Sequence, residues 1–178
     1  MKKVILAFIA AMVMAVFAPL GVERSAIILD NGKIRHDGAA LMFAVTANPT
    51  VWDGTPASSN WQIAEAVSEW NKRSGFEATM VSSSTANIRV TEMADNCGVN
   101  FGVVLGCAYS DGTIHLNPFY AQEPLAEHVG IHELGHTFGH GHAPSTARSV
   151  MKASVSASTW YRAPQSYDYR IQRQLYGR

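Results

Sequence analysis

The chain has 178 residues, of which 47% are hydrophobic and 10% aromatic, so it can bury one core of ordinary size and is too short for two comfortable domains. Lys and Arg together number 14, as do Asp and Glu, and no run of like charge stands out. This balance gives no support to a nucleic-acid partner or to binding at an anionic membrane surface. We therefore expect one monomeric domain with a charge-balanced surface.

The first residues have the pattern of an export signal. Lys2 and Lys3 precede an almost uninterrupted apolar stretch, residues 4–17, and residues 16–18 offer small side chains at a cleavage point. We expect residues 1–18 to be removed and the protein to be secreted without stable membrane association. An uncleaved signal anchor is the alternative, although the apolar stretch is shorter than the roughly 20 residues that span a bilayer.

The chain has two cysteines, Cys97 and Cys107. In an exported protein such a pair normally forms a disulfide, which we predict here. Free or metal-bound thiols are the alternative. No CxxC spacing supports a separate zinc site.

The segment that follows the signal, residues 19–40, carries the turn dipeptides Asn31-Gly32 and Asp37-Gly38, so we expect an irregular or hairpin-forming lead-in. The main domain should comprise residues 41–178. Its β-rich start, 41–46, predicts a first strand, and the Gly-, Pro- and Ser-rich residues 51–59 predict a loop.

Apolar residues at helical spacing from Trp61 to Trp70 predict an amphipathic helix that begins at Asn60, has about four turns and ends at Ser74-Gly75. Strands are expected next, at 76–81, 86–91 and 112–116, with a Gly-rich segment at 97–106. A second helix should run from about 123 to 138. Ser166 or Asp168 should cap a short last helix.

The second predicted helix carries two potential metal ligands. His132 and His136 are four residues apart, so both imidazoles project from one face and can bind the same ion. A catalytic zinc ion takes three protein ligands and keeps a fourth position for water. A third ligand must therefore come from beyond the helix.

Gly139 and His142 supply that third ligand. Glycine tolerates positive φ, so Gly139 can end the helix and let the chain reverse until His142 reaches the metal. Glu133 follows the first ligand and can hydrogen-bond the metal's water without coordinating the ion, which makes it the expected general base. The pattern predicts one catalytic Zn²⁺ ion and gives no indication for or against calcium.

The five residues His132, Glu133, His136, Gly139 and His142 spell HExxHxxGxxH, and the chain resembles a matrixin-type metzincin. Ser149-Val150-Met151, nine residues after His142, matches the family's Met-turn, whose methionine forms an apolar floor beneath the metal. The tail from Asp168 to Gly177 is similar to the family's last helix. The pattern around Trp61 and Trp70, followed by Phe76, is similar to its first helix.

This resemblance implies an α+β, zincin-like fold: a twisted, mixed five-stranded sheet with two long helices, a zinc cleft and a small C-terminal subdomain ending in a helix. It places an antiparallel edge strand at residues 102–109, where a protein or peptide substrate would bind as an added extended strand. The wall between Met151 and Pro164 would set side-chain preference. The implied activity is hydrolysis of peptide bonds by a secreted endopeptidase.

The chain also departs from the family. It has no PRCGV-type inhibitory cysteine before the domain, and Lys152 stands where the relatives with a tyrosine ligand carry tyrosine. His115 resembles one histidine of the matrixin structural zinc site, but we expect an ordinary strand residue there, and surface histidines at His128 and His140. The alternative function is a catalytically inactive, secreted zinc-binding or adhesion module.

Overall fold

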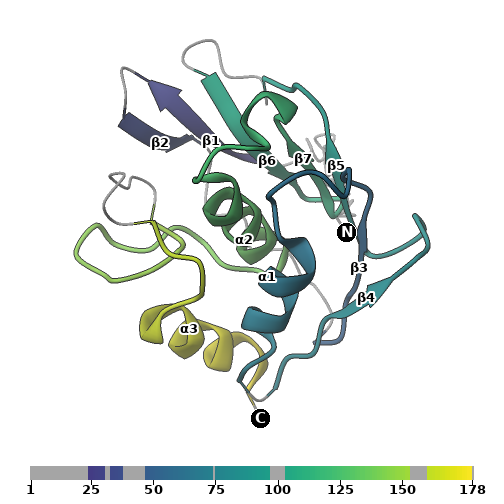
Figure 1. The fold of residues 1–178 in the computed structure, drawn as a ribbon. Helices are drawn as coiled ribbons and strands as arrows, with labels where there is room; N and C mark the ends of the chain where they lie inside the picture. Colours follow the sequence, from purple (N-terminus) through teal and green to yellow (C-terminus); the bar gives the residue numbers. More distant parts are fainter. Residues whose placement is uncertain are drawn as a thin grey trace, which may run out of the picture.

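A computed structural model describes residues 24–30, 33–37, 47–73, 75–96, 103–152 and 160–177 (Figure 1). The expected signal, residues 1–18, and the expected strand at 41–46 lie outside the described residues. The fold is α+β, with one mixed sheet and three α-helices among the described residues. In chain order the strands are β1 (Arg24–Asp30), β2 (Lys33–Asp37), β3 (Thr50–Asp53), β4 (Thr79–Val81), β5 (Ile88–Glu92), β6 (Val103–Tyr109) and β7 (Thr113–Leu116).

The described strands lie in the order β2-β1-β6-β7-β5-β3-β4. Strands β3 to β7 form the expected five-stranded mixed part, in which β4, β3, β5 and β7 are parallel to their neighbours and β6 is antiparallel to β7. Strand β3 corrects the loop predicted at 51–59. Its composition is loop-like from Gly54 onward, but Val51 is fully buried because the strand lies between β4 and β5.

Strand β6 is not an edge strand, contrary to the expectation for residues 102–109. On its second side β6 pairs with β1 in antiparallel orientation, and β1 pairs with β2 in the same way. The lead-in segment thus forms a hairpin that extends the sheet by two strands. The physical reason is that a strand edge offers unpaired backbone groups, and the chain's own N-terminal segment satisfies them.

Helices α1 (Ile63–Trp70) and α2 (Ala126–Thr137) pack beside the sheet, and α3 (Ser166–Tyr176) lies at the lower left of the view, away from the strands (Figure 1). Helix α1 has eight residues, fewer than the predicted four turns require. It cannot begin at Asn60 because Gln62 has a φ of 53°. It stops after Trp70 because the Asn71 side chain bonds both backbone groups of Ala78 and turns the chain toward β4.

Helices α2 and α3 lie where the sequence predicts them, but the cap of α3 differs from the prediction. Gln165, rather than Ser166 or Asp168, is the N-cap residue, and the Asp168 carboxylate accepts a hydrogen bond from the Gln165 N–H at 2.8 Å. A short 3₁₀ helix, η1 (Pro118–Tyr120), links β7 to the segment before α2.

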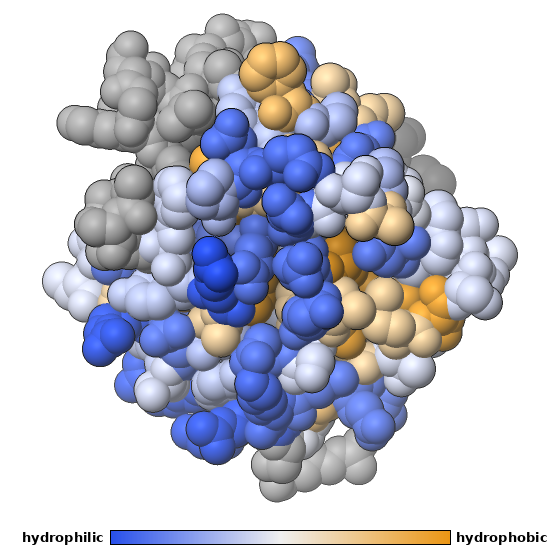
Figure 2. All heavy atoms as spheres, in the orientation of Figure 1, coloured by the Kyte–Doolittle hydropathy of each residue, from blue (hydrophilic) through white to orange (hydrophobic). Residues whose placement is uncertain are grey.

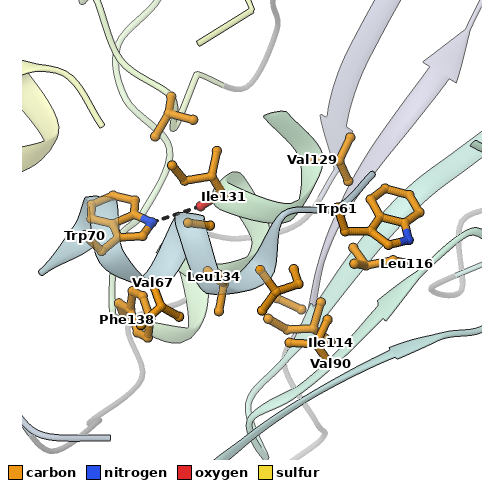
Figure 3. Close-up of a cluster of buried hydrophobic side chains, with 14 of the residues drawn as sticks. Trp61, Val67, Trp70, Val90, Ile114, Leu116, Val129, Ile131, Leu134 and Phe138 are labelled. Carbon is orange, nitrogen blue, oxygen red and sulfur yellow. Dashed lines mark hydrogen bonds between the residues drawn. The ribbon is translucent and has the colours of Figure 1, made fainter. Parts of the chain in front are cut away.

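The core lies between the sheet and the paired helices α1 and α2 (Figure 3). Trp70 is fully buried, and its indole N–H donates to the carbonyl of Ile131 at 3.1 Å, which fixes α1 against α2. Its ring meets Phe138 edge to face at a centroid distance of 6.1 Å. Buried aromatic side chains contribute large apolar areas to a core, so this contact helps to hold α2 in position.

Hydrophilic side chains form a band down the middle of the face shown in Figure 2, with apolar residues gathered mainly at its right side. Within the described part of the chain, each helix is too short or too polar to cross a lipid bilayer.

Candidate metal centre

Helix α2 places His132 and His136 side by side in the interior. Both side chains are fully buried, and their ring centroids lie 4.6 Å apart. The spacing of four residues puts them one turn apart on the same face of the helix, as predicted.

His142 reaches the same point because the chain reverses at Gly139. Gly139 has a φ of 85°, a left-handed conformation that favours glycine, and its N–H bonds the His136 carbonyl as the helix ends. The His142 ring lies 4.8 Å from that of His136 and 5.6 Å from that of His132. The ligand atoms of all three histidines lie within 4.8 Å of one another, close enough for one metal ion to bind them.

Backbone carbonyl groups set the orientation of two of these rings. His132 Nδ1 lies 2.8 Å from the Val150 oxygen, and His136 Nδ1 lies 2.8 Å from the His140 oxygen. A carbonyl can only accept, so each Nδ1 carries the proton and each Nε2 carries the lone pair. A metal ligand requires this tautomer, and such outer contacts commonly fix it in metal sites.

The surroundings also keep these histidines neutral. Burial, together with the nearby His142, lowers the pKa of His136 to about 3. Burial lowers the pKa of His142 to about 4. Because a metal displaces the proton from its ligands, a cluster that is neutral at pH 7 is ready to bind one.

Glu133 lies between the two helical histidines in sequence and is fully buried. Among the described residues, neither of its carboxylate oxygens has a hydrogen-bond partner. Burial raises its pKa well above the usual value. A buried carboxyl group without a partner is costly, and native proteins keep such a group mainly where an ion, water or substrate completes its contacts.

The donor set fits zinc. Three imidazole ligands leave one position of a tetrahedral ion open, which is the arrangement of catalytic sites, whereas structural sites use four protein ligands. Glu133 follows His132 on the same helix, and its carboxyl group has no hydrogen-bond partner among the described residues. The structure therefore brings together the three histidines that the sequence singled out as ligands, namely His132, His136 and His142.

The Met151 segment packs beneath this helix. Met151 is 1% exposed and lies so close to Gly135 that a Cβ there would collide with its sulfur. Asp168 of α3 holds the segment: its carboxylate accepts from the Val150 N–H at 3.0 Å and from the Ser149 hydroxyl. The sequence marked Asp168 only as a helix residue, because backbone partners leave no trace in a residue pattern.

His115, His128 and His140 lie outside the cluster, and two of them were predicted in the wrong environment. His128 is 1% and His140 2% exposed, so neither is a surface residue. His128 Nδ1 lies 3.1 Å from the Tyr161 oxygen, and the His140 ring packs 4.5 Å from that of Trp70. His115 lies on β7, as expected, with Nδ1 2.8 Å from Asp95 Oδ2.

Only one of the two cysteines in the predicted disulfide lies among the described residues. Cys107 is buried on β6 at 1% exposure, whereas Cys97 lies outside the described residues. The pairing of Cys97 with Cys107 therefore stays a prediction.

No protein-family model matches this chain, and a search of curated proteins finds no match to it. The geometry of the three histidines and the burial of Glu133 are therefore the observations that bear on function.

Proposed function

We propose that this protein is a zinc-dependent endopeptidase that hydrolyses peptide bonds in protein substrates. The observation that carries the proposal is the buried Glu133 carboxyl group, without a partner among the described residues, on the helix that supplies two of three histidines whose ligand atoms lie within 4.8 Å of one another. A site that only stores or displays zinc has no need for this acid.

His132, His136 and His142 would hold the ion. A zinc ion bound there supplies Lewis acidity, which polarises the peptide carbonyl group and makes a neighbouring water more acidic. Glu133 takes the proton from that water as the water oxygen attacks the carbonyl carbon. It then delivers the same proton to the leaving amide nitrogen as the C–N bond breaks, so the carboxylate is regenerated.

Burial raises the pKa of Glu133, which makes its carboxylate a stronger base for the first half of this cycle. A general base that must also act as an acid works best when its pKa lies near the working pH. Burial supplies the upward shift, and the carbonyl groups of Val150 and His140 keep the histidine rings turned so that their lone pairs remain available to the metal.

The metzincin-like arrangement belongs to the same proposal. It is supported by the helix end at Gly139, by the return of His142 to the helical pair, and by Met151 packed under α2. A secreted, monomeric enzyme with a signal at residues 1–18 and a small C-terminal subdomain around α3 completes the proposed picture.

Replacement of the base tests the mechanism. In Glu133→Gln, the carboxylate is lost while the shape of the side chain stays, so zinc content should remain near one ion per chain while casein cleavage falls by about 10²–10⁴-fold. Glu127→Gln, on the same helix and paired with Arg162 at 3.2 Å, is the matched control and should cleave normally.

Two results would contradict the proposal in different ways. Unchanged cleavage by Glu133→Gln would remove Glu133 from the mechanism. A wild-type protein that binds one zinc ion per chain but cleaves neither casein nor a diverse peptide library would instead be the inactive zinc-binding module.

A further inference from the structure

Strand β1 lies one strand away from the proposed general base. In the register of β1 on β6, Ile27 is opposite Gly106. Gly106 faces Glu133 directly, since a Cβ added to it would lie 3.1 Å from Glu133 Cγ and 3.3 Å from Oε1. Neighbouring strands are about 4.8 Å apart, so the backbone of β1 passes at about that distance from Gly106, the residue of β6 that faces Glu133.

Both sides of β6 at this point are already paired. Gly106 is opposite Leu116 of β7 on one side and Ile27 of β1 on the other. An extended peptide that reaches a sheet binds by adding a strand to a free edge. Because β7 takes the other side of β6, the edge that loss of the hairpin would free is the one that β1 occupies.

The pairing is irregular at the same point. The register shifts between Ile27, opposite Gly106, and Ile28, opposite Val104, so Leu105 forms a bulge in β6. Bulges are enriched beside active sites, where they interrupt pairing and redirect the chain. The contact between β1 and β6 is therefore least regular where it passes the proposed site.

The hairpin depends on β6 for its place in the sheet. Beyond β1 there is only β2 in the described strand order, and an isolated two-stranded hairpin is at best marginally stable in water. Loss of the β1–β6 pairing would thus release residues 24–37 as a unit. Removal of a signal at residues 1–18 would leave this hairpin on the chain.

We propose that β1 is an intramolecular competitor for substrate: it occupies the edge of β6 on which an extended peptide must lie, and the enzyme reaches full activity when the β1–β2 hairpin is displaced or cut away. The inference rests on the proposed endopeptidase function.

A proline in β1 tests the competition. Ile27→Pro removes a backbone N–H opposite Gly106 and weakens the pairing of the strand. If the docked hairpin outnumbers the open form tenfold, the KM for a fluorogenic peptide should fall about tenfold at unchanged kcat. Asp37→Pro, at the end of the outermost strand where proline is tolerated, is the matched control and should leave KM unchanged.

A crosslink tests the opposite change and does not depend on a weakened sheet. Leu29 and Val103 are register partners, and the spacing of directly opposed residues, about 4.5–5.5 Å between Cα atoms, suits a disulfide. Oxidised Leu29→Cys/Val103→Cys protein should lose at least about tenfold in cleavage rate and regain it on reduction, with wild type under the same reductant as control. Full activity of the crosslinked protein would overturn the proposal.

A binding measurement separates this inference from the proposed chemistry. In a Glu133→Ala background, a fluorescent synthetic peptide with the sequence of residues 24–37 should bind about tenfold more tightly when Ile27→Pro is also present. Hydrogen exchange should show faster exchange of the β6 amides in that variant. Faster exchange without tighter peptide binding would overturn the inference, and this arm remains decisive even if no variant cleaves any peptide.

Discussion

Burial favours the neutral form of Glu133 and the neutral forms of the clustered histidines alike. The Glu133 carboxyl group loses hydration and, among the described residues, gains no hydrogen bond in return, while burial favours the neutral form of His136 and His142. A divalent cation would suit both kinds of group, since it binds the lone pairs of neutral imidazoles and stabilises a nearby carboxylate. Removal of the partnerless carboxyl should not unfold the protein, so activity loss in Glu133→Gln would report on chemistry.

His128 gives the metal-free protein a pH-dependent stability. Its pKa in the folded state is lowered to about 4 by burial, against about 6.5 in the unfolded chain. As the pH falls from 6.5 to 4, His128 is protonated in the unfolded state but stays neutral in the folded state. The free energy of unfolding therefore decreases over this pH range.

The His128→Gln variant should therefore lose less stability on acidification. Between pH 7 and pH 4.5, the decrease in the free energy of unfolding of the chelator-treated protein should be smaller by about 2 kcal/mol than in wild type. Urea unfolding at the two pH values measures this decrease in each protein. The difference between the two proteins at pH 7 alone gives the cost of the replacement in packing. An equal decrease in both proteins would mean that His128 is already charged in the folded state.

At the scale of helices and strands, prediction from sequence succeeded where local residue types alone mark the ends of an element. Helix α2 begins and ends within a few residues of its predicted bounds because Pro124 and Gly139 punctuate a long segment. Strand β3 was missed because four residues carry no readable period and its burial comes from β4 and β5. The β1–β6 pairing joins residues about 80 apart in sequence, and only the folded sheet determines it.

The candidate metal centre also has parts that local sequence signals predict and parts that only the folded structure determines. The juxtaposition of the three candidate ligands follows from spacing along one helix and a glycine turn, and the role of Glu133 as the base stays a prediction. The contacts that orient them, Val150 O on His132 and Asp168 on the Val150 N–H, involve backbone atoms or a different element. Every residue type at position 150 would have the same backbone carbonyl group, so the sequence pattern gives no sign of this contact.

The connection from α3 to the metal centre can be tested at Asp168. Asp168→Ala removes the acceptor of the Ser149 hydroxyl and of the Val150 and Gln165 N–H groups. Loss of such buried hydrogen bonds should lower the free energy of unfolding by about 2–4 kcal/mol. Because Val150 also orients His132, zinc affinity should fall by about 10- to 100-fold.

Urea unfolding and zinc titration of the same samples measure the two effects of this replacement. Ser166→Ala, in the exposed first turn of the same helix, is the control and should stay within about 0.5 kcal/mol of wild type. A destabilised Asp168→Ala protein with normal zinc affinity would show that α3 supports the fold without acting on the site.

In the molecule as a whole, a metal ion at the candidate centre would add a link between parts that hydrogen bonds already join. Two candidate ligands lie on α2, and the third lies on the segment after it, which is closed by the Ala143 N–H bonded to the Met151 carbonyl at 2.8 Å. That segment leads to the Ser149–Met151 turn held by α3. A ligand that binds only the folded form stabilises the whole cooperative unit, whatever part it touches.

Zinc should therefore raise the melting temperature of the entire domain. At a free zinc concentration of about 100 times Kd, the stabilisation is about 2.7 kcal/mol, and in a domain of this size each kcal/mol shifts Tm by about 2–4 °C. We expect an increase of about 5–10 °C over the chelator-treated protein, seen in scanning calorimetry as a single transition. His142→Ala should lose most of this increase, whereas His140→Gln should keep it because the His140 ring packs on Trp70, outside the cluster. An equal response of these two variants would mean that the third ligand is not His142.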